Sequence, residues 1–527
     1  MNNYKMMNYC RLFNAYRLMK NLRNYSTVTD ENFEKWNAVI GLEVHAQISS
    51  ESKLFSGAST SFVQPVNTCV SFFDCATPGT LPVLNKKCVE AGVLTALALS
   101  CQINEVSFFD RKHYFYADLP AGYQITQQRQ PLAIGGKLKF NVFTPGIHRQ
   151  PYIKSSKIKQ IQLEHDSGKS LHDEFENRSL IDLNRAGIPL MELVFEPDLA
   201  DGEEAAALVK ELINILQRLK TCSCKMEEGA LRVDANISVH KPNECLGVRT
   251  EVKNISSVRG IANAIKYEIN RQKRILSNGG KIVNETLTWD ALKNKTVSMR
   301  TKEEKHDYRF MPEPNLPPLR VHIRKDCENK YNLIDVNEIA LRIPKLPEEI
   351  REHLRNNLGL SPHATIVLVN NYELTEVFEK IISENNKRQP QMVANILLNQ
   401  VLEFVNKHKL NFEHQALQPQ KLGQVMDLFH NNVINLNVME ELFEKMIAEP
   451  LKTPIQVVEE NKMEQINDEL VLERIIRDVL VENTKKVNQY KNGKKKVLRS
   501  IIGQIAKKTN DRANMSKVHD ILIKILG

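Results

Sequence analysis

Apolar and polar residues alternate along several short segments in the first part of the chain. From residue 38 to residue 48 every second residue is apolar, while Glu43 and His45 lie on the opposite, polar side. The same alternation runs through LRVDANISVH at residues 231–240 and through GVRTEVKN at residues 247–254. Successive side chains of a β-strand point to opposite faces of its sheet. These segments are therefore predicted to be strands with one buried face and one polar face.

Amphipathic helices are predicted between and after these strands. Residues 203–220 bring Leu208 and Leu212 onto one apolar stripe, and a second helical pattern at residues 259–277 ends before an Asn-Gly-Gly sequence. Strands mixed with amphipathic helices predict an α+β domain, built on a largely antiparallel sheet, over residues 36–335.

Helical patterns dominate beyond about residue 337, where the strand pattern fades. Residues 469–483 form a good amphipathic helix, and residues 483–510 carry nine Lys or Arg residues and no acid. We predict an all-α middle domain over residues 336–455 and a small helical tail domain over residues 456–527. A charge run is usually a solvated face, but its acid-free length equally suits contact with nucleic-acid phosphates.

The first 27 residues differ from the rest of the chain. They carry five Lys or Arg residues and no acid, among Asn, Tyr, Leu and Met residues. Such a leader is typical of a mitochondrial transit peptide, and the alternative is an unstructured basic tail. Without these charges the net charge of +9 falls to about +4, so any nucleic-acid contact of the remaining chain must be local.

The overall composition is that of a soluble protein with more than one domain. Apolar residues make up 42% and charged residues 26%, which are ordinary values, and 527 residues are too many for a single core. No apolar run approaches about 18 residues, so no transmembrane helix is expected. The nine cysteines form no CxxC pair, which argues against a disulfide framework and fits a reducing compartment.

The polar faces of the predicted strands bring together carboxylates and an imidazole. Solvent exposure of one sheet face explains such residues without any site. A site for a divalent metal and phosphates is the alternative, because Mg²⁺ prefers a few carboxylates, waters and phosphate oxygens. Gly41 favours the site, since a glycine weakens a strand unless something approaches its backbone closely. The residues concerned are Glu43, His45, Glu164, Asp234 and Glu251.

The sequence Gly168-Lys169-Ser170 looks like the end of an ATP-binding P-loop. A P-loop needs another glycine five positions earlier, because its bare backbone N–H groups wrap the phosphate, and Leu163 stands at that position. If the chain binds ATP, it does so with other groups.

Six long motifs, in order along the chain, resemble the B subunit of the tRNA-dependent amidotransferase, and the resemblance runs from about residue 36 to the C-terminus. That family converts Glu-tRNA(Gln) or Asp-tRNA(Asn) to the amide form. The motifs are VIGLEVHAQISSESKLFS, FDRKHYFYADLPAGYQITQ, QLEHDSGKS, IDLNRAGIPLMELVFEPD, KMEEGALRVDANISV and DYRFMPEPNLPPL.

The resemblance implies a reaction with ATP, Mg²⁺ and the charged 3′ end of a tRNA. The tRNA-bound glutamate is phosphorylated and ammonia then displaces phosphate, because a carboxylate oxygen is a poor leaving group. The implied fold is a cradle similar to glutamine synthetase and guanidino kinases, which use no P-loop, followed by a YqeY-like tail that grips tRNA. Ammonia is expected from a glutaminase, the partner A subunit, with a small C subunit bracing the two. The leader points to the mitochondrial matrix and favours Glu-tRNA(Gln).

Individual residues take their expected roles from the motifs they occupy. His165 stands where bacterial relatives have a second acid. It could bind the metal itself, contact the residues that bind the metal, or have no part in the site. The expected catalytic residues are Glu43, His45, Glu164 and Asp234, and the expected metal ligands are Glu43, His45, Glu164 and His165. ATP or substrate contacts are expected from Lys112, Tyr114, Asn184, Arg185, Lys225 and Arg232, and tRNA contacts from Lys491, Lys494, Lys495, Lys496 and Arg499.

The chain departs from many bacterial relatives at their zinc-binding cysteines. The matching positions are Ser56, Ala58, Ser71 and Asp74, which supply no thiolate, so no structural zinc is expected. The nearby Cys69 and Cys75 are interpreted as small buried residues.

Two other classes of function remain open at this point. A non-enzymatic RNA-binding or assembly factor would keep the cradle as a scaffold, and the His165 substitution favours it. A free-standing carboxylate kinase would act on free glutamate, and the basic tail argues against it.

Overall fold

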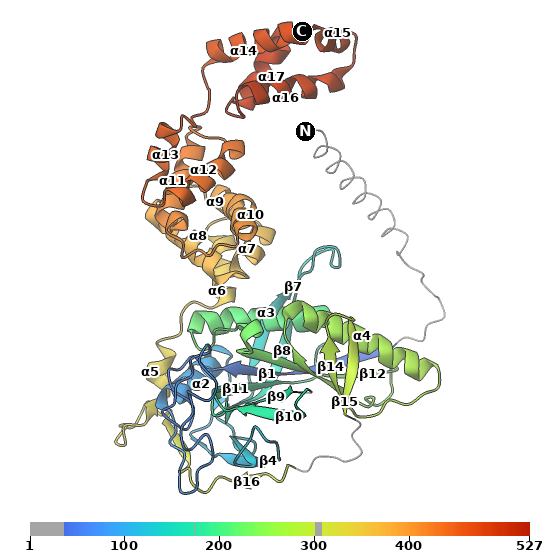
Figure 1. The fold of residues 1–527 in the computed structure, drawn as a ribbon, viewed down its shortest axis with the longest axis vertical. Helices are drawn as coiled ribbons and strands as arrows, with labels where there is room; N and C mark the ends of the chain where they lie inside the picture. The colour runs from blue at the N-terminus through green and yellow to red at the C-terminus, as the bar shows by residue number, and fades with distance from the viewer. Residues whose placement is uncertain (1–35, 174, 301–307, 527) are drawn as a thin grey trace.

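The computed structural model describes residues 36–173, 175–300 and 308–526, so the predicted leader at residues 1–27 lies outside the described residues. Three separate hydrophobic cores follow one another along an elongated molecule (Figure 1). Their buried residues span 40–339, 350–463 and 472–526. The predicted class, an α+β body followed by helices, is confirmed. The predicted domain limits at 335/336 and 455/456 remain predictions.

The body is built on a ten-stranded sheet, ordered β15-β14-β13-β12-β1-β11-β8-β6-β2, with β7 also paired to β8. Within the described residues, every pairing in this sheet is antiparallel except that of β13 with β14. The strands are β1 (Asn37–Gln47), β2 (Gln102–Ile103), β6 (Ala133–Ile134), β7 (Lys137–Val142), β8 (Tyr152–His165), β11 (Pro189–Phe195), β12 (Leu231–His240), β13 (Thr250–Ile255), β14 (Thr286–Asp290) and β15 (Lys295–Arg300).

Strand β1 lies in the middle of this sheet and keeps the alternation that its sequence predicts. Ile40, Leu42 and Val44 are fully buried. A Cβ added to Gly41 would make an ordinary contact with Pro197, whose Cβ would lie 3.4 Å away, so a residue of the chain itself already lies over this glycine. The glycine is therefore not a sign of a ligand.

Two long helices, α3 (Gly202–Leu219) and α4 (Val258–Ser277), cover the apolar face of the sheet (Figure 1). Their N-caps are Asp201 and Ser257, whose side chains accept from backbone N–H groups of the first turn. Periodicity predicts both helices, and the structure confirms them. Gly202 lets them approach closely, since a Cβ there would lie 2.4 Å from the carbonyl oxygen of Ala262.

Smaller elements surround the other, polar face of the sheet (Figure 1). They form a hairpin, two three-stranded sheets and the short helix η2 (Met226–Glu228). The strands are β9 (Lys169–Asp173) and β10 (Arg178–Asp182); β4 (Asp110–His113), β5 (Tyr123–Thr126) and β16 (Met311–Pro312); β3 (Val106–Ser107), β17 (Leu319–His322) and β18 (Ile334–Asp335). Helix α2 (Lys86–Ala98) lies instead on the apolar side, where a Cβ added to its Gly92 would contact the Leu163 side chain of β8.

Helices make up the middle region and the tail, as predicted. The body ends with α5 (Val336–Ala340), whose Val336 and Ile339 belong to the first core. The middle region contains α6 (Pro347–Asn356), α7 (Pro362–Val369), α8 (Tyr372–Glu384), α9 (Pro390–Ile396), the π-helical turn η3 (Leu397–Val401), α10 (Leu402–His408), η4 (Gln415–Leu417), α11 (Pro419–His430), α12 (Leu436–Ala448) and α13 (Pro454–Glu460). The tail contains α14 (Glu469–Glu482), α15 (Thr484–Lys491), η5 (Lys495–Val497), α16 (Leu498–Lys508) and α17 (Met515–Leu526). Among the described residues, no helix has both the length and the apolar character needed to cross a bilayer.

The joint between the body and the middle region is a buried ion pair. Arg351 of α6 binds Glu211 of α3 through both carboxylate oxygens, with Nη1 2.9 Å from Oε1. Their side chains are 7% and 5% exposed. An amide contact, Asn214 to Asn370 at 3.4 Å, lies beside the pair. The helical region is thus tied to the back of the sheet that carries the polar face.

Candidate active site

Four polar side chains lie in one row across four neighbouring strands. His45 of β1 is directly opposite Arg232 of β12 on one side and Glu192 of β11 on the other, and Glu192 is opposite Gln162 of β8. Residues directly opposite each other in an antiparallel sheet share a face and lie about 5 Å apart. The row therefore faces away from α3 and α4, on the polar face of the sheet.

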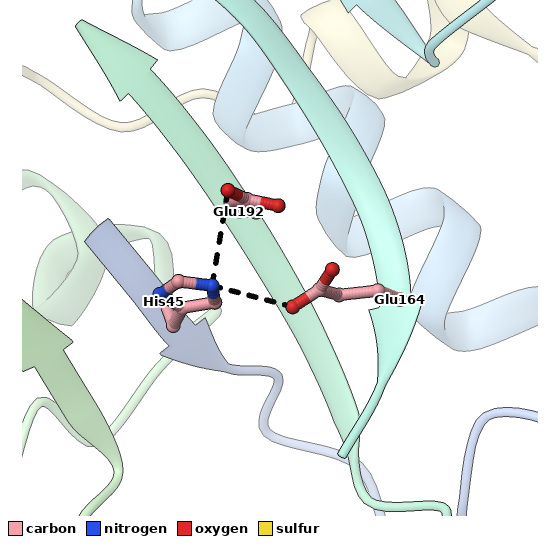
Figure 2. Close-up of side chains that lie close together, drawn as sticks. All are labelled: His45, Glu164 and Glu192. Atoms are coloured by element: carbon pink, nitrogen blue, oxygen red, sulfur yellow. Dashed lines mark ion pairs between the residues drawn. The ribbon is translucent and has the colours of Figure 1, made fainter. Parts of the chain in front are cut away.

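His45, Glu164 and Glu192 meet at the centre of this face (Figure 2). Nε2 of His45 is 3.4 Å from Oε1 of Glu164 and 3.8 Å from Oε1 of Glu192. One ligand atom from each residue lies within 4.8 Å of the other two, and no other such group of three is present among the described residues. The side chains are only 20%, 3% and 13% exposed. We call these three residues the carboxylate cluster.

The two carboxylates of this cluster are electrostatically unfavourable neighbours. Burial raises the pKa of Glu164, and burial together with the charge of Glu164 raises the pKa of Glu192 to about 7. Lys112 opposes both pKa shifts through its positive charge. A divalent cation would remove the repulsion, and two carboxylates with one imidazole are a donor set that such cations accept. The residues present fit a divalent cation.

Hydrogen bonds fix the two carboxylates in place. The amide nitrogen of Gln162 donates to Oε2 of Glu192 and, at 3.1 Å, to the hydroxyl of Thr126. That hydroxyl donates in turn to Oε2 of Glu164 at 3.3 Å. One oxygen of each carboxylate is engaged in this way, which leaves Oε1 of both directed toward His45 (Figure 2).

Glu43 and Asp234 lie opposite each other one step further along the same face. Oε1 of Glu43 accepts from the amide of Asn236 at 2.9 Å. Asp234 accepts from Nζ of Lys253 at 3.0 Å and from the backbone N–H of Asn254 at 3.1 Å. Both predicted residues border the carboxylate cluster, with their own hydrogen-bond partners, and lie outside the group of three.

Two arginines hold the turn that follows β8. Nη2 of Arg232 donates to Asp166 at 2.8 Å, and Arg185 donates to the carbonyls of Ser167 and Gly168 at 3.0 and 2.6 Å. The backbone N–H of Gly168 donates to the carbonyl of Asp118 at 2.8 Å and is not available to a phosphate. This turn is therefore no P-loop, as its sequence indicates. Nε of Arg232 is buried without a partner among the described residues, which leaves a donor on the polar face.

His165 points to the other face of β8, away from the carboxylate cluster. Its Nε2 accepts from the backbone N–H of Ile125 at 3.2 Å, and its ring packs edge-on against Phe55 with centroids 5.7 Å apart. Burial lowers the pKa of His165 to about 4, so the ring is neutral at physiological pH. The structure does not bring this residue together with His45 and Glu164.

The remaining predicted substrate contacts divide into two groups. Lys112 and Tyr114 both interact electrostatically with Glu164. The charge of Lys112 lowers the pKa of Glu164, and the pKa of Tyr114 is raised by burial and, to a smaller extent, by the charge of Glu164. Asn184 instead holds a loop, accepting from the N–H of Cys69 at 2.8 Å and donating to a carbonyl at 2.7 Å. Lys225 is exposed and pairs with Glu228 at 3.0 Å. Neither Asn184 nor Lys225 is brought to the cluster.

A buried lysine lies among the positions that match zinc ligands in bacterial relatives. Lys53 is fully buried, and its Nζ is 3.1 Å from Oδ2 of Asp74, which also accepts from the Ser56 hydroxyl and the Ser71 N–H. A carboxylate neutralised by an ammonium is a poor site for a second cation. The prediction that Cys75 is buried is wrong, because that thiol is exposed in a turn, while Cys69 is buried as expected.

The five predicted tRNA contacts lie in the tail, far along the chain from the cluster, and all are exposed. Within the part of the chain that the structure describes, no acid lies within ion-pair distance of any of them, whereas the neighbouring Lys508 pairs with Glu482 at 2.7 Å. The exposed positive residues are Lys491, Lys494, Lys495, Lys496 and Arg499.

Glu192 is the site residue that sequence reasoning missed. It lies in PLMELVF, where Met191 and Leu193 are buried and alternate with Glu192. This alternation was a usable signal, because it marks a lone carboxylate on the polar side of an otherwise apolar strand. Its position opposite His45 required the strand register, which no single strand reveals.

Comparisons with known proteins agree along almost the whole chain. One family model, described as the GatB/GatE catalytic domain, matches residues 38–326, and another, described as the GatB domain, matches residues 376–526. The chain is 53% identical over 512 residues to the B subunit of the mitochondrial glutamyl-tRNA(Gln) amidotransferase of Aedes aegypti, covering 96% of each chain. It is 47% identical over 502 residues to the Homo sapiens protein of the same description, covering 95% of this chain and 90% of that one. It is 42% identical over 491 residues to the B subunit of the aspartyl/glutamyl-tRNA(Asn/Gln) amidotransferase of Rickettsia typhi, covering 93% and 98%.

Proposed function

The chain belongs to the GatB/GatE family, and from this we propose that it acts in mitochondria as the B subunit of a glutamyl-tRNA(Gln) amidotransferase. Its product is Gln-tRNA(Gln), made by transamidation of Glu-tRNA(Gln), and the family implies use of ATP. The A and C subunits of the same complex are its partners. The observation that carries the chemical part of this proposal is the carboxylate cluster of His45, Glu164 and Glu192 on the polar face of the sheet.

The first chemical step is transfer of a phosphoryl group. The side-chain carboxylate of the tRNA-bound glutamate attacks the γ-phosphorus of ATP, the bond to the β,γ-bridging oxygen breaks, and ADP leaves. Such a transfer depends mostly on positioning and on positive charge around the phosphoryl oxygens. Bound Mg²⁺, held by His45, Glu164 and Glu192, would supply part of that charge.

Residues of the chain supply the rest of that positive charge and the positioning. Lys112 acts electrostatically on both Glu164 and Glu192, which puts its charge next to the phosphates in this scheme. Arg232 keeps a buried Nε–H without a partner among the described residues, and we assign this donor to a phosphate or carboxylate oxygen of the substrates. Gln162 and Thr126 hold the two carboxylates in one orientation, so that little reorganisation accompanies the reaction.

The second step is attack of ammonia on the acyl phosphate. The nitrogen forms a bond to the side-chain carbonyl carbon, the carbon–oxygen bond to phosphate breaks, and inorganic phosphate leaves with formation of the amide. Ammonia comes from glutamine that the partner glutaminase hydrolyses. The largely dry surroundings of the cluster keep water from competing for the acyl phosphate.

The basic tail would hold the body of the tRNA. Five exposed cations without an ion-pair partner among the described residues suit the phosphates of an RNA backbone, which position a substrate without reading its sequence. The tail is joined to the middle region by hydrogen bonds such as Asn435 to the carbonyl of Asp511 at 2.7 Å. We propose that the tail holds the body of the tRNA while its acceptor end reaches the carboxylate cluster.

The test is formation of Gln-tRNA(Gln) by the complex reconstituted from its three subunits. Replacing Glu192 by Gln keeps its size and removes its charge, and we expect amidation to fall at least about 100-fold. The matched control is Glu105→Gln, a half-exposed carboxylate on the surface of the body, which should retain normal activity. Equal activity of E192Q and wild type would reject the cluster as the reaction centre.

A second measurement separates an enzyme from a scaffold. We expect Mg²⁺-dependent ATP hydrolysis by the complex to be stimulated by Glu-tRNA(Gln) and to be lost in E192Q. ATP hydrolysis that charged tRNA does not stimulate, or no ATP hydrolysis at all, would favour an RNA-binding scaffold. Activity on free glutamate without tRNA would favour a free-standing carboxylate kinase.

A further inference from the structure

An aromatic loop, Tyr114–Gly122, stands beside the carboxylate cluster and has no assigned role beyond Tyr114. It follows β4 and returns to β5 on the polar side of the sheet. Its three consecutive aromatic residues are Tyr114, Phe115 and Tyr116. Tyr114 is mostly buried, whereas Phe115 is 86% exposed and Tyr116 is 44% exposed. Large exposed aromatic side chains next to a reaction centre call for an explanation, since such surface usually marks a binding site.

The loop is held in one conformation by its own backbone. The N–H of Tyr114 donates to the carbonyl of Gly122 at 3.1 Å, and the N–H of Gly122 donates to the carbonyl of Leu119 at 2.9 Å. Asp118 ties the loop to the start of β9, since its carboxylate accepts from the Ser170 hydroxyl at 3.0 Å. The exposed rings are thus carried by an ordered loop.

Gly122 supports one side of the Phe115 ring. It has a φ of +72°, and a Cβ added there would lie 3.0 and 3.2 Å from two carbons of that ring. Only a glycine combines this backbone conformation with such a close approach. One side of Phe115 therefore rests on backbone while the remainder of the ring is open to solvent.

The rings lead toward the reaction centre. Tyr116 packs edge-on against Tyr114 with centroids 5.7 Å apart. The Tyr114 hydroxyl donates to Gln124 at 3.3 Å, and the amide of Gln124 donates to the carbonyl of His165, the neighbour of Glu164 in the chain. A group stacked on Tyr116 would lie next to Tyr114, whose pKa is raised by burial and by the charge of Glu164 in the carboxylate cluster.

We propose that the aromatic loop binds the unpaired 3′ end of the charged tRNA, with Phe115 and Tyr116 stacking on its bases. This inference rests on the proposed function, which brings that end to the cluster. The terminal adenosine carries the aminoacyl ester, so its base must lie close to the glutamate that reacts. Unpaired bases of RNA are commonly held by stacking on aromatic side chains.

Exposure and charge favour RNA over the adenine of ATP as the occupant. Binding sites for small molecules enclose most of their ligand, whereas Phe115 stands almost entirely in solvent and suits a strand that arrives from outside. An exposed cation, Lys169, lies between Gly168 and Ser170, the two residues that bind Asp118 of the loop. A positive charge beside stacked rings complements the phosphates of a single strand.

The experiment uses the full complex and varies the two rings. We expect Phe115→Ala and Tyr116→Ala each to raise the KM for Glu-tRNA(Gln) by roughly 5- to 30-fold, because stacking of one base is worth about that factor, with little change in the KM for ATP. Phe115→Trp and Tyr116→Phe keep a ring and should retain the wild-type KM. Tyr331→Ala is the matched control, since Tyr331 is 85% exposed in the loop before β18 and should behave as wild type.

A fluorescent tRNA reports stacking directly. With 2-aminopurine in place of the terminal adenine, binding to the wild-type complex should quench its fluorescence, and the double variant F115A/Y116A should bind without quenching. An unchanged KM for tRNA together with normal quenching would overturn the inference, and a rise confined to the KM for ATP would reassign the loop to the nucleotide. If the wild-type complex made no Gln-tRNA(Gln) at all, the proposed function would fail instead.

Discussion

The carboxylate cluster and the basic tail both depend on charge, but their surroundings differ. In the cluster, Glu164 is 3% exposed and His45 is 20% exposed, and hydrogen bonds fix the carboxylates. In the tail, Lys494, Lys495 and Lys496 are all exposed and have no acid within ion-pair distance among the described residues. Removing the carboxylates of the buried cluster from water costs free energy, and their hydrogen bonds hold them in one geometry. The lysines of the tail stay hydrated, and salt screens their charges.

This difference suits the two tasks that we propose for these regions. Stabilising a transition state requires groups that are already in place and poorly screened, because electrostatic energies grow as water is excluded. Holding a long polyanion requires many weak contacts that can form in several geometries. Substitutions in the two regions should therefore change different kinetic constants.

The largest effect is expected from His45→Ala. This change removes the central side chain of the carboxylate cluster, and we expect kcat for amidation to fall at least about 100-fold while the KM for charged tRNA stays within a factor of about two. Steady-state kinetics of the reconstituted complex measure both constants. Gln47→Ala, on the same face of β1, is the control. A variant with altered KM and normal kcat would contradict the division of tasks.

The buried ion pair that joins the body to the middle region should contribute strongly to stability. Arg351→Met leaves Glu211 buried without its partner, and burial already raises the pKa of Glu211, so we expect a loss of about 3–5 kcal/mol in the free energy of unfolding. Urea denaturation of the purified chain measures the loss. Lys345→Met, an exposed change in the same region, should cost little. A loss below about 1 kcal/mol would show that the joint does not depend on this ion pair.

A moderate effect is expected from replacing Lys494, Lys495 and Lys496 by Ala. The KM for charged tRNA should rise several-fold, and the slope of log affinity against log salt should become shallower by about 2, with kcat unchanged. Affinity measured from low to moderate salt provides the slope. Replacing Lys137, Lys139 and Lys157 of the β7–β8 hairpin by Ala is the matched control. If both triple variants had the same slope, the tail would not be the RNA contact.

The smallest effect at neutral pH is expected from His165→Gln. Burial holds the pKa of His165 at about 4, below its ordinary value near 6.5, so the unfolded chain binds a proton between these values that the folded protein does not. The buried neutral His165 therefore makes its full contribution to the free energy of unfolding above pH 6.5, and this contribution is lost as the pH falls toward 4. H165Q should therefore show a shallower loss of stability over this window, by up to about 1.4 kcal/mol per pH unit. Parallel curves for variant and wild type would contradict a buried neutral ring.

Periodicity predicted the elements of this fold well, because each depends on its own residues. The strands at residues 38–48 and 231–240 and the helices at 203–220 and 259–277 are present within one or two residues of their predicted limits. Their hydrophobic positions alone decide which side faces the core.

The same reasoning predicted only part of the candidate active site, because the site depends on the register of strand pairing. Glu192 comes next to His45 only after β1 and β11 pair, and no local pattern states that pairing. His165 shows the converse: adjacent residues of a strand point to opposite faces, so Glu164 and His165 could not both join one cluster on the sheet. The residue that lies over Gly41 was also out of reach of this reasoning, because Pro197 is 156 positions further along the chain.

The central place of β1 has a consequence for how this sequence can vary. Insertions and deletions are common in surface loops, but one residue gained or lost between Ile40 and His45 would exchange the inner and outer sides of everything after it up to the next turn. The imidazole of His45 would then point into the hydrophobic core, and the side chain of Val44 would lie on the polar face of the sheet. We therefore expect natural variants and engineered libraries to tolerate length changes in the hairpin loop at 143–151, and to lose folding and catalysis together when the spacing of Glu43, His45 and the valine between them is altered.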